Sequence, residues 1–480
     1  MDARELFQIQ SRRQFLKETA GGLGIIALAH LLALEGYTAD FVAASEANNS
    51  RKPHFPPRAK RIIFIFMAGA PSQLDLFDPK PEMKKYHGQP IPKSLIKDLT
   101  DNVVKGGDVM ASPRTFQAYG QCGMEFSDYV PHTARWADEI CLVRSMHTDI
   151  ANHHPAQLVM NCGTPRAGHP CMGSWVTYGL GSESQNLPGF VVMTSSSGKG
   201  IEAGAQNWSN GFLPSDYRGV PFRSTGDAVL HLSNPRGMSM ETQRARLDAM
   251  RELNQHRLDE SGDVEIASRM ASYELAFRMQ TAGPELLNLA QESAATRALY
   301  GLDQEKTRAF GTNCLLARRL VERGVRFVQL YHSTWDDHAD LNEHLRINCE
   351  MTDLPTAALL EDLKQRGLLA ETLVIWGGEF GRTPMNEVRR GNTPGKEGRD
   401  HHPFAFSLWL AGGGIKGGQV IGKTDDFGYH IVEGPVHVHD LQATILHCLG
   451  IDHTRLTYRH SGRDFRLTDV GGQLVKQMLA

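Results

Sequence analysis

Short runs of apolar residues recur along the chain, and each run ends in small or polar residues. The first, RIIFIFMAGA at residues 61–70, is continuously apolar, which is typical of a strand buried on both faces of a parallel sheet. Five later runs share this character: ICLVRSM (140–146), GFVVM (189–193), VRFVQLY (325–331), TLVIWGG (372–378) and FSLWLAGG (406–413).

Helical patterns lie between these runs. We predict a short helix over residues 154–160, a longer one over 350–365 with apolar residues at helical spacing, and a third over 437–449. Strands that alternate with helices predict a doubly wound α/β fold, with a mostly parallel sheet and helices on both faces. In such sheets ligands bind at the carboxyl ends of the strands, so the residues after each run are of most interest.

One long segment interrupts the alternation. Residues 236–323 are almost entirely helix-forming, with Gly262, Gly283 and Pro284 as the breaks. We interpret this segment as a helical insertion packed on the sheet. The whole of residues 61–470 is then one domain.

The N-terminal residues resemble an export signal. Residues 11–17 (SRRQFLK) match the twin-arginine consensus, and a weakly apolar stretch follows at 20–34. We predict a twin-arginine signal over residues 1–47, a polar linker over 48–60, the twin-arginine translocase as a partner, and a periplasmic or extracellular location. The alternatives are an amphipathic helix with a chance arginine pair and, since the cleavage site is poorly marked, an uncleaved membrane anchor.

The composition narrows the classes of partner. A formal net charge of −3 gives no indication of a nucleic-acid or anionic-membrane partner. Seven cysteines with no CxxC pair form neither a disulfide scaffold nor a zinc ribbon. We expect most of them to be buried, while Cys162 and Cys171 are candidates to pair after export.

Carboxylates and imidazoles gather where the predicted strands end. This mixture is favoured by divalent ions, so we predict a metal site that holds zinc, manganese or calcium. The predicted ligands are Asp75, Asp336, His338, Glu379, His401 and His402. Each group alone has a simpler interpretation, such as a turn with a hydrogen-bonded histidine or a surface histidine pair, but the groups recur at several strand ends.

The order of elements resembles the alkaline phosphatase and sulfatase superfamily over residues 58–470. TLVIWGGEFG is similar to the sulfatase strand TLVIFTSDNG, which places Glu379 where that family has a metal-binding aspartate. VHVHDLQATILHCLGID resembles a sulfatase helix in which Asp440 would be structural.

A closer resemblance is to a twin-arginine-exported bacterial family known as domain of unknown function fifteen-oh-one, a sulfatase-like branch of that superfamily. It rests on FMAGAPSQLDLFDPKP, MGSWVTYGLGSE, GGEFGRTP, GRDHHP and GRDFRLTDV. This family brings no established reaction.

The nucleophile position departs from the sulfatase pattern. Sulfatases begin a helix with a cysteine that becomes formylglycine, whereas His153 stands at the aligned position and no cysteine starts that motif. Formylglycine chemistry is therefore not expected. Three alternatives stay open: His153 is a nucleophile or a metal ligand, a metal-bound hydroxide attacks directly, or the site has lost its chemistry. Arg382 is the candidate clamp for an anionic substrate.

These features predict an exported metal-dependent hydrolase of phosphate or sulfate esters, acting on a small anionic ester or glycan without formylglycine. The alternative is a non-catalytic, envelope-associated binding protein on a degenerate phosphatase-like fold. The metal content of the purified protein distinguishes the two.

Overall fold

The computed structural model describes residues 52–92, 94, 107–195, 200–224, 229–230, 232–388 and 395–480. The predicted signal at 1–47 lies outside these residues, so export stays a prediction. Within the described part of the chain, no helix is long and apolar enough to cross a membrane.

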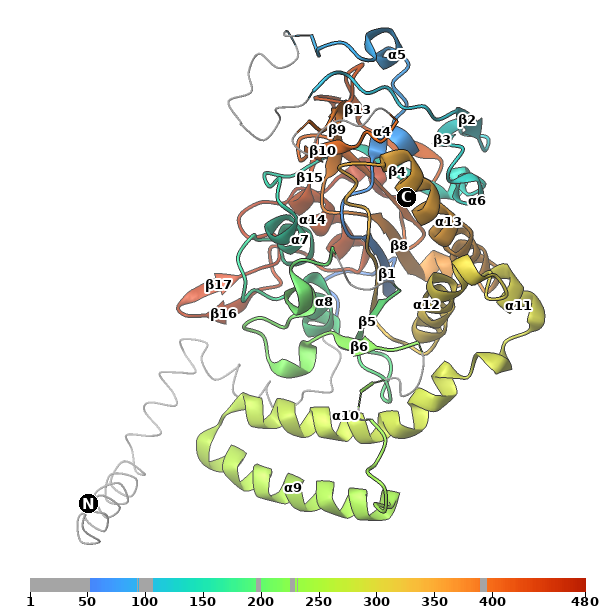
Figure 1. Ribbon diagram of the computed structural model, residues 1–480. Coiled ribbons are helices and arrows are strands. Elements are labelled where there is room, and N and C mark those ends of the chain that lie inside the picture. The colour runs from blue at the N-terminus through green and yellow to red at the C-terminus, as the bar shows by residue number, and fades with distance from the viewer. Residues whose placement is uncertain are drawn as a thin grey trace.

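A nine-stranded sheet forms the centre of the molecule (Figure 1). Eight strands run in the order β12-β4-β11-β8-β1-β7-β5-β6, and β15 also pairs with β4. All pairings are parallel except those of β11. The predicted α/β fold with a mostly parallel sheet is confirmed. The strands are β1 (Arg61–Met67), β4 (Ile140–His147), β5 (Phe190–Thr194), β6 (Val220–Phe222), β7 (Phe327–His332), β8 (Thr372–Gly377), β11 (Phe406–Ala411), β12 (Gln419–Ile421) and β15 (Val436–His437).

Strand β1 shows why its residues are apolar throughout. Ile62, Phe64 and Phe66 belong to one hydrophobic core, and the alternate residues Ile63 and Ile65 belong to another. Successive side chains of a strand point to opposite faces, so each face of the sheet has its own core. Both faces are covered by helices, as predicted.

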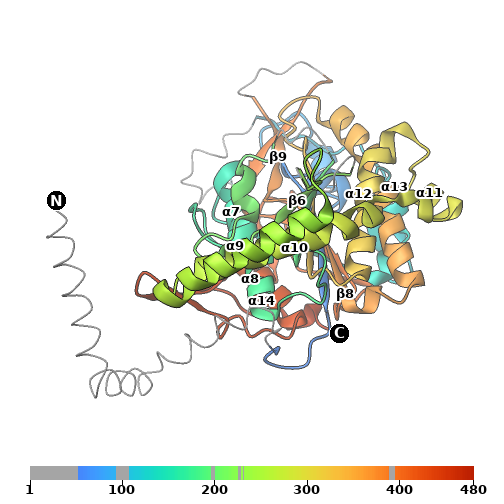
Figure 2. The same cartoon turned by 90° about the horizontal axis from the view of Figure 1, so that it is seen from below.

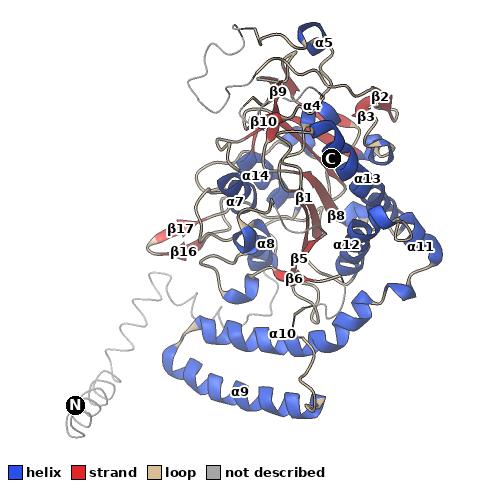
Figure 3. Cartoon of the chain, in the orientation of Figure 1, coloured by secondary structure: helices blue, strands red, loops and turns tan. Residues whose placement is uncertain are grey.

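Each face of the sheet is covered by its own set of helices. Helices α7 (His153–Cys162), α8 (Met172–Leu180) and α14 (Val438–Cys448) supply the core that contains Phe64. Helices α12 (Glu305–Glu322) and α13 (Leu341–Gln365) supply the other core. Figure 3 shows α7 and α8 on one side of β1, and α12 and α13 on the other.

Strand β11 runs antiparallel to both neighbours, β8 and β4. After β8 ends, the chain forms the hairpin of β9 (Gly381–Asn386) and β10 (Arg399–His402). The described part of the connection from β8 to β11 contains no helix that returns the chain to the opposite edge, so β11 enters the sheet at the edge where β8 left it. Such an entry is antiparallel, and it places the residues before β11 at the carboxyl ends of the parallel strands.

The segment predicted as a helical insertion contains helices α9 (Met240–Ser261), α10 (Val264–Leu287), α11 (Ala294–Leu299) and α12. Helices α9 and α10 lie side by side at one end of the molecule (Figures 1 and 2). Helix α12 packs against β7, β1 and α13. The other elements are α4 (Gln73–Leu76), α5 (Met83–Tyr86), β2 (Phe116–Tyr119), β3 (Met124–Ser127), α6 (Pro131–Ala134), β13 (Lys423–Thr424), β14 (Ile431–Glu433), β16 (Tyr458–His460) and β17 (Arg463–Phe465).

Candidate metal centre

Three imidazoles and one carboxylate meet at the carboxyl edge of the sheet. Asp336 and His338 lie in the loop after β7, His401 lies in β10, and His153 is the first residue of α7. The donor atoms of these four residues all lie within 4.8 Å of one another. We call His153, Asp336, His338 and His401 the four-residue cluster.

Asp336 is the centre of the cluster. Its Oδ1 lies 3.1 Å from His153 Nε2, 3.0 Å from His338 Nε2 and 3.4 Å from His401 Nε2. The Nε2 atoms of His338 and His401 are themselves 3.0 Å apart. The same ring nitrogen of all three histidines therefore faces one point beside the Asp336 carboxylate.

In His153 and His401 the other ring nitrogen, Nδ1, contacts an oxygen acceptor outside the cluster. His401 Nδ1 donates to the carbonyl oxygen of Ala151 at 2.7 Å, and His153 Nδ1 contacts Glu379 Oε1 at 2.7 Å. An acceptor at Nδ1 fixes the tautomer and leaves the lone pair of Nε2 for a ligand. This arrangement is the usual one around metal-binding histidines.

His338 follows the same pattern with a different partner. Its Nδ1 lies 3.3 Å from Glu387 Oε2 and 3.9 Å from Asp400 Oδ1, and both carboxylates are buried. These three residues form a second group of ligand type. Because Nδ1 of His338 faces this group and Nε2 faces Asp336, the two carboxylates orient the ring toward the four-residue cluster.

The electrostatics of the cluster favour a cation. Burial alone would raise the pKa of Asp336, but the three imidazoles and Arg382 hold it far below its usual range. Burial lowers the pKa of His401 to about 4. Burial also opposes charge on His153, yet the proximity of Asp336 and Glu379 raises its pKa to about 9, so a metal ion would displace a proton from this ring on binding. A firmly ionised carboxylate thus lies among imidazole nitrogens.

Arg382 lies behind Asp336 and is fully buried. Its Nη2 donates to Asp336 Oδ1 at 2.8 Å, and its other donors reach the backbone carbonyl oxygens of Gly69, Ala70, Trp335 and Arg399. The residue predicted as a substrate clamp is therefore placed where its guanidinium supports Asp336.

Glu379 lies directly outside the cluster. Its carboxylate accepts from the backbone N–H of Gly69 at 3.0 Å and from Gln157 Nε2 at 3.1 Å, in addition to its contact with His153. The structure brings this predicted ligand to the site as the partner of a histidine. It is not one of the four converging residues.

Two predicted ligands lie elsewhere. Asp75 is buried against Arg399, whose Nε lies 2.8 Å from Asp75 Oδ2. His402 Nε2 donates to the carbonyl oxygen of Tyr429 at 2.8 Å, and burial lowers its pKa to about 4. Neither residue belongs to a ligand group in the described part of the chain.

The donor set can be tested against a metal from the structure itself. His153 Nε2 is buried, and among the residues that the structure describes it has no hydrogen-bond partner, although it lies near Asp336. A buried polar atom without a partner is costly, and a metal ion at the convergence point removes that cost. Three imidazole nitrogens and one carboxylate oxygen are also a donor set that a tetrahedral divalent ion accepts. The residues therefore fit a metal.

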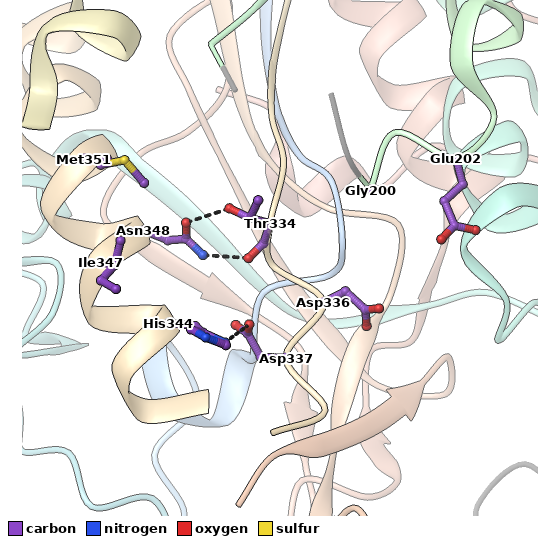
Figure 4. Close-up of a pocket in the computed structure, with 9 residues that line it drawn as sticks. All are labelled: Gly200, Glu202, Thr334, Asp336, Asp337, His344, Ile347, Asn348 and Met351. Atoms are coloured by element: carbon purple, nitrogen blue, oxygen red, sulfur yellow. Dashed lines mark hydrogen bonds and ion pairs between the residues drawn. The ribbon is translucent and has the colours of Figure 1, made fainter. Parts of the chain in front are cut away.

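A pocket of about 550 Å³ opens beside Asp336. Figure 4 shows Asp336 and Asp337 at the centre of its wall, with residues of α13 on one side and Glu202 on the other. Its lining comprises Gly200, Glu202, Thr334, Asp336, Asp337, His344, Ile347, Asn348 and Met351. Asp336 is the member of the four-residue cluster that reaches this pocket, and its side chain is 34% exposed.

The cysteines lie apart from this chemistry. All seven are free thiols, and six of them are buried, in keeping with the predicted burial. Cys162 and Cys171, the candidates for a disulfide, contact the Gln206 carbonyl and the Ser174 hydroxyl instead.

Comparison with known proteins places the chain in a family. A family model described as "Protein of unknown function (DUF1501)" matches residues 59–479. The chain belongs to this family. No curated protein matches this DUF1501 chain.

Solved structures with similarity to this DUF1501 chain include a sulfatase, a lipoteichoic acid synthase and an alkaline phosphatase. The PsFucS1 sulfatase from Pseudoalteromonas sp. is 12% identical, with 87% of this chain and 71% of that chain covered and a TM-score of 0.34. The lipoteichoic acid synthase LtaP from Listeria monocytogenes is 9% identical, with 89% and 80% covered and a TM-score of 0.38. The alkaline phosphatase from the Antarctic bacterium TAB5 is 12% identical, with 82% and 98% covered and a TM-score of 0.32. At such low sequence identity, any inference about the chemistry must come from the residues of the site itself.

Proposed function

We propose that this protein is an exported, metal-dependent hydrolase of phosphate or sulfate esters. The observation that carries the proposal is the convergence of three imidazole Nε2 atoms and Asp336 Oδ1 on one point. His153, Asp336, His338 and His401 would hold one divalent ion there. The reaction class is supported by the sulfatase-like segments of the sequence, and the substrate is a small anionic ester or glycan.

The donor set favours zinc or manganese over calcium. Calcium prefers six to eight oxygen ligands, whereas three of the four donors in this cluster are imidazole nitrogens. Imidazole suits zinc and other transition metals. When bound, such an ion supplies Lewis acidity, which draws electrons from an ester oxygen and lowers the pKa of water.

The protein's own residues prepare the site for that ion. Backbone carbonyls hold Arg382, and Arg382 in turn holds Asp336, so that the carboxylate faces both the imidazoles and the pocket. Glu379 fixes the ring of His153 by its contact at Nδ1. Because these contacts already hold the side chains in place, the side chains need not rearrange when a metal ion binds, which favours tight binding.

His153 is assigned to metal binding and not to nucleophilic attack. Its Nδ1 is engaged by Glu379, and its Nε2 is buried 3.1 Å from Asp336. Neither nitrogen is directed at an open position for a substrate. Attack by water, with no covalent intermediate on the chain, is the route that this placement supports.

The proposal is tested by metal analysis and turnover on the same preparation. Protein purified without chelator is assayed on aryl phosphate, aryl phosphate diester and aryl sulfate with added zinc or manganese. We expect turnover of at least one class, lost on dialysis against chelator and restored by metal. Bound metal without turnover of any ester would instead favour the envelope-associated binding protein.

A further inference from the structure

His344 and Asp337 form a pair on the wall of the pocket beside the four-residue cluster. His344 Nδ1 lies 3.0 Å from Asp337 Oδ1, and Figure 4 shows the imidazole directed at this carboxylate. Both side chains line the same pocket as Asp336. A histidine paired with a carboxylate thus shares one cavity with the candidate metal centre.

The two members of the pair differ in exposure. Asp337 is buried, with 3% of its side chain exposed, whereas the side chain of His344 is 49% exposed. The backbone of Asp337 is fixed at both ends, because its N–H donates to the carbonyl of Trp335 and its carbonyl accepts from the N–H of Arg399. A rigid, buried carboxylate therefore orients a histidine that faces solvent.

The free nitrogen of His344 is available to a ligand. In the described part of the chain the imidazole contacts Asp337 through Nδ1, and no hydrogen bond to Nε2 occurs. Acceptance by a carboxylate at Nδ1 holds the tautomer and the ring orientation, as the aspartate does in a serine–histidine–aspartate triad. Nε2 is then the ring nitrogen left to contact a ligand in the pocket.

We propose that His344 is the proton donor to the leaving alcohol in the hydrolysis, and that Asp337 is its positioning residue. This inference rests on the proposed function. Water adds to phosphorus or sulfur, the bond from that atom to the alcohol oxygen breaks, and the electron pair stays on this oxygen. His344 donates the Nε2 proton to it, and the proton released by the water restores the protonated imidazole, so atoms and charge balance.

A purely structural role would have a different signature. His344 lies in the first turn of α13, and its backbone N–H already donates to the carbonyl of Asp340 at 3.0 Å. The helix therefore begins without help from the imidazole. If the pair were only structural, its loss would lower the stability of the fold and would affect the turnover of all substrates equally.

The test varies the leaving group while the transferred group stays the same. A para-nitrophenyl ester needs little protonation of its leaving oxygen, whereas a phenyl or alkyl ester needs much. We expect His344→Ala to lower kcat on the phenyl ester about 100-fold and on the nitrophenyl ester less than about tenfold, with metal content unchanged. Added imidazole should restore part of the lost rate on the phenyl ester.

Two further variants complete the experiment. Asp337→Asn should lower kcat on the phenyl ester with little change in KM, because the ring loses its orientation and not its place in the pocket. His256→Ala, which removes an exposed histidine from α9, should leave both rates unchanged. Equal losses on both esters, or no loss, in His344→Ala would overturn the role of His344 while the hydrolase stands. If the metal-loaded wild type turned over no ester, the proposed function would fall, and the role of His344 with it.

Discussion

Glu379→Gln removes the charge that holds His153 in place. Glu379 is fully buried, and Oε1 receives the contact from His153 Nδ1 at 2.7 Å and the N–H of Gly69 at 3.0 Å. A glutamine has the same shape and can place its carbonyl oxygen at the Oε1 position, but this neutral oxygen is a weaker acceptor than the carboxylate, so the His153 ring is held less firmly. Loss of such an outer partner costs about 10- to 100-fold in metal affinity, which is about 1.4 to 2.7 kcal/mol.

Affinity is measured by competition between the protein and a chromogenic chelator for zinc. We expect the Kd of Glu379→Gln to rise by that factor, with one binding site retained. Asp75→Asn is the matched control, since it also alters a buried carboxylate but breaks the pair with Arg399. It should lower the unfolding temperature and leave the Kd unchanged. The same Kd in Glu379→Gln and the wild type would refute the assigned role of Glu379.

Three other predictions concern separate parts of the chain. Cys162→Ala and Cys171→Ala should retain hydrolysis, and loss of sulfate-ester turnover in either would revive formylglycine chemistry. Burial lowers the pKa of His332 in the folded chain to about 4, below the ordinary value of 6.5. As the pH falls, the histidine is therefore protonated in the unfolded chain before it is protonated in the folded one. Stability from His332 is thus complete above about pH 6.5 and is lost as the pH falls toward 4, by about 3 kcal/mol at most. Urea unfolding at both pH values should show a smaller loss in His332→Asn, and an equal loss would contradict this origin. Lysine at both Arg12 and Arg13 should leave the protein in the cytoplasm on cell fractionation, and normal export would rule out the twin-arginine route.

The sheet could be predicted because its strands are apolar on both faces. All six predicted strands are present, within about three residues of the expected ends. The direction of β11 could not be read from its apolar residues, because a buried strand has the same composition in either direction. It follows from the β9–β10 hairpin, which keeps the chain at one edge of the sheet.

The sequence predicted the types of residue at the candidate site, namely carboxylates and imidazoles. It predicted less well which individual residues belong to the site. His401 and His402 are adjacent in β10, so their side chains point to opposite sides, and only His401 joins the four-residue cluster. Had residues 399–402 been recognised as a strand, the alternation of side chains along a strand would have indicated that only one of the two histidines faces the site.

Other members depend on contacts between distant segments. Asp75 is paired with a guanidinium 324 residues away. Glu387 and the carbonyl of Ala151 orient His338 and His401, and neither has a local sequence signal. Sequence patterns place polar groups at strand ends, but they do not show which of those groups satisfy one another.

The central claim is that His153, Asp336, His338 and His401 hold one divalent ion. The most direct measurement is elemental analysis of protein purified without chelator, with Asp336→Ala prepared in parallel. The account predicts about one equivalent of zinc or manganese per chain in the wild type and a large loss in Asp336→Ala. The Asp336 carboxylate contacts all three histidines of the four-residue cluster, so this change removes more contacts within the cluster than the loss of any one histidine. A wild type that carries no metal and binds none on titration, or an Asp336→Ala variant with full metal content, would contradict the claim.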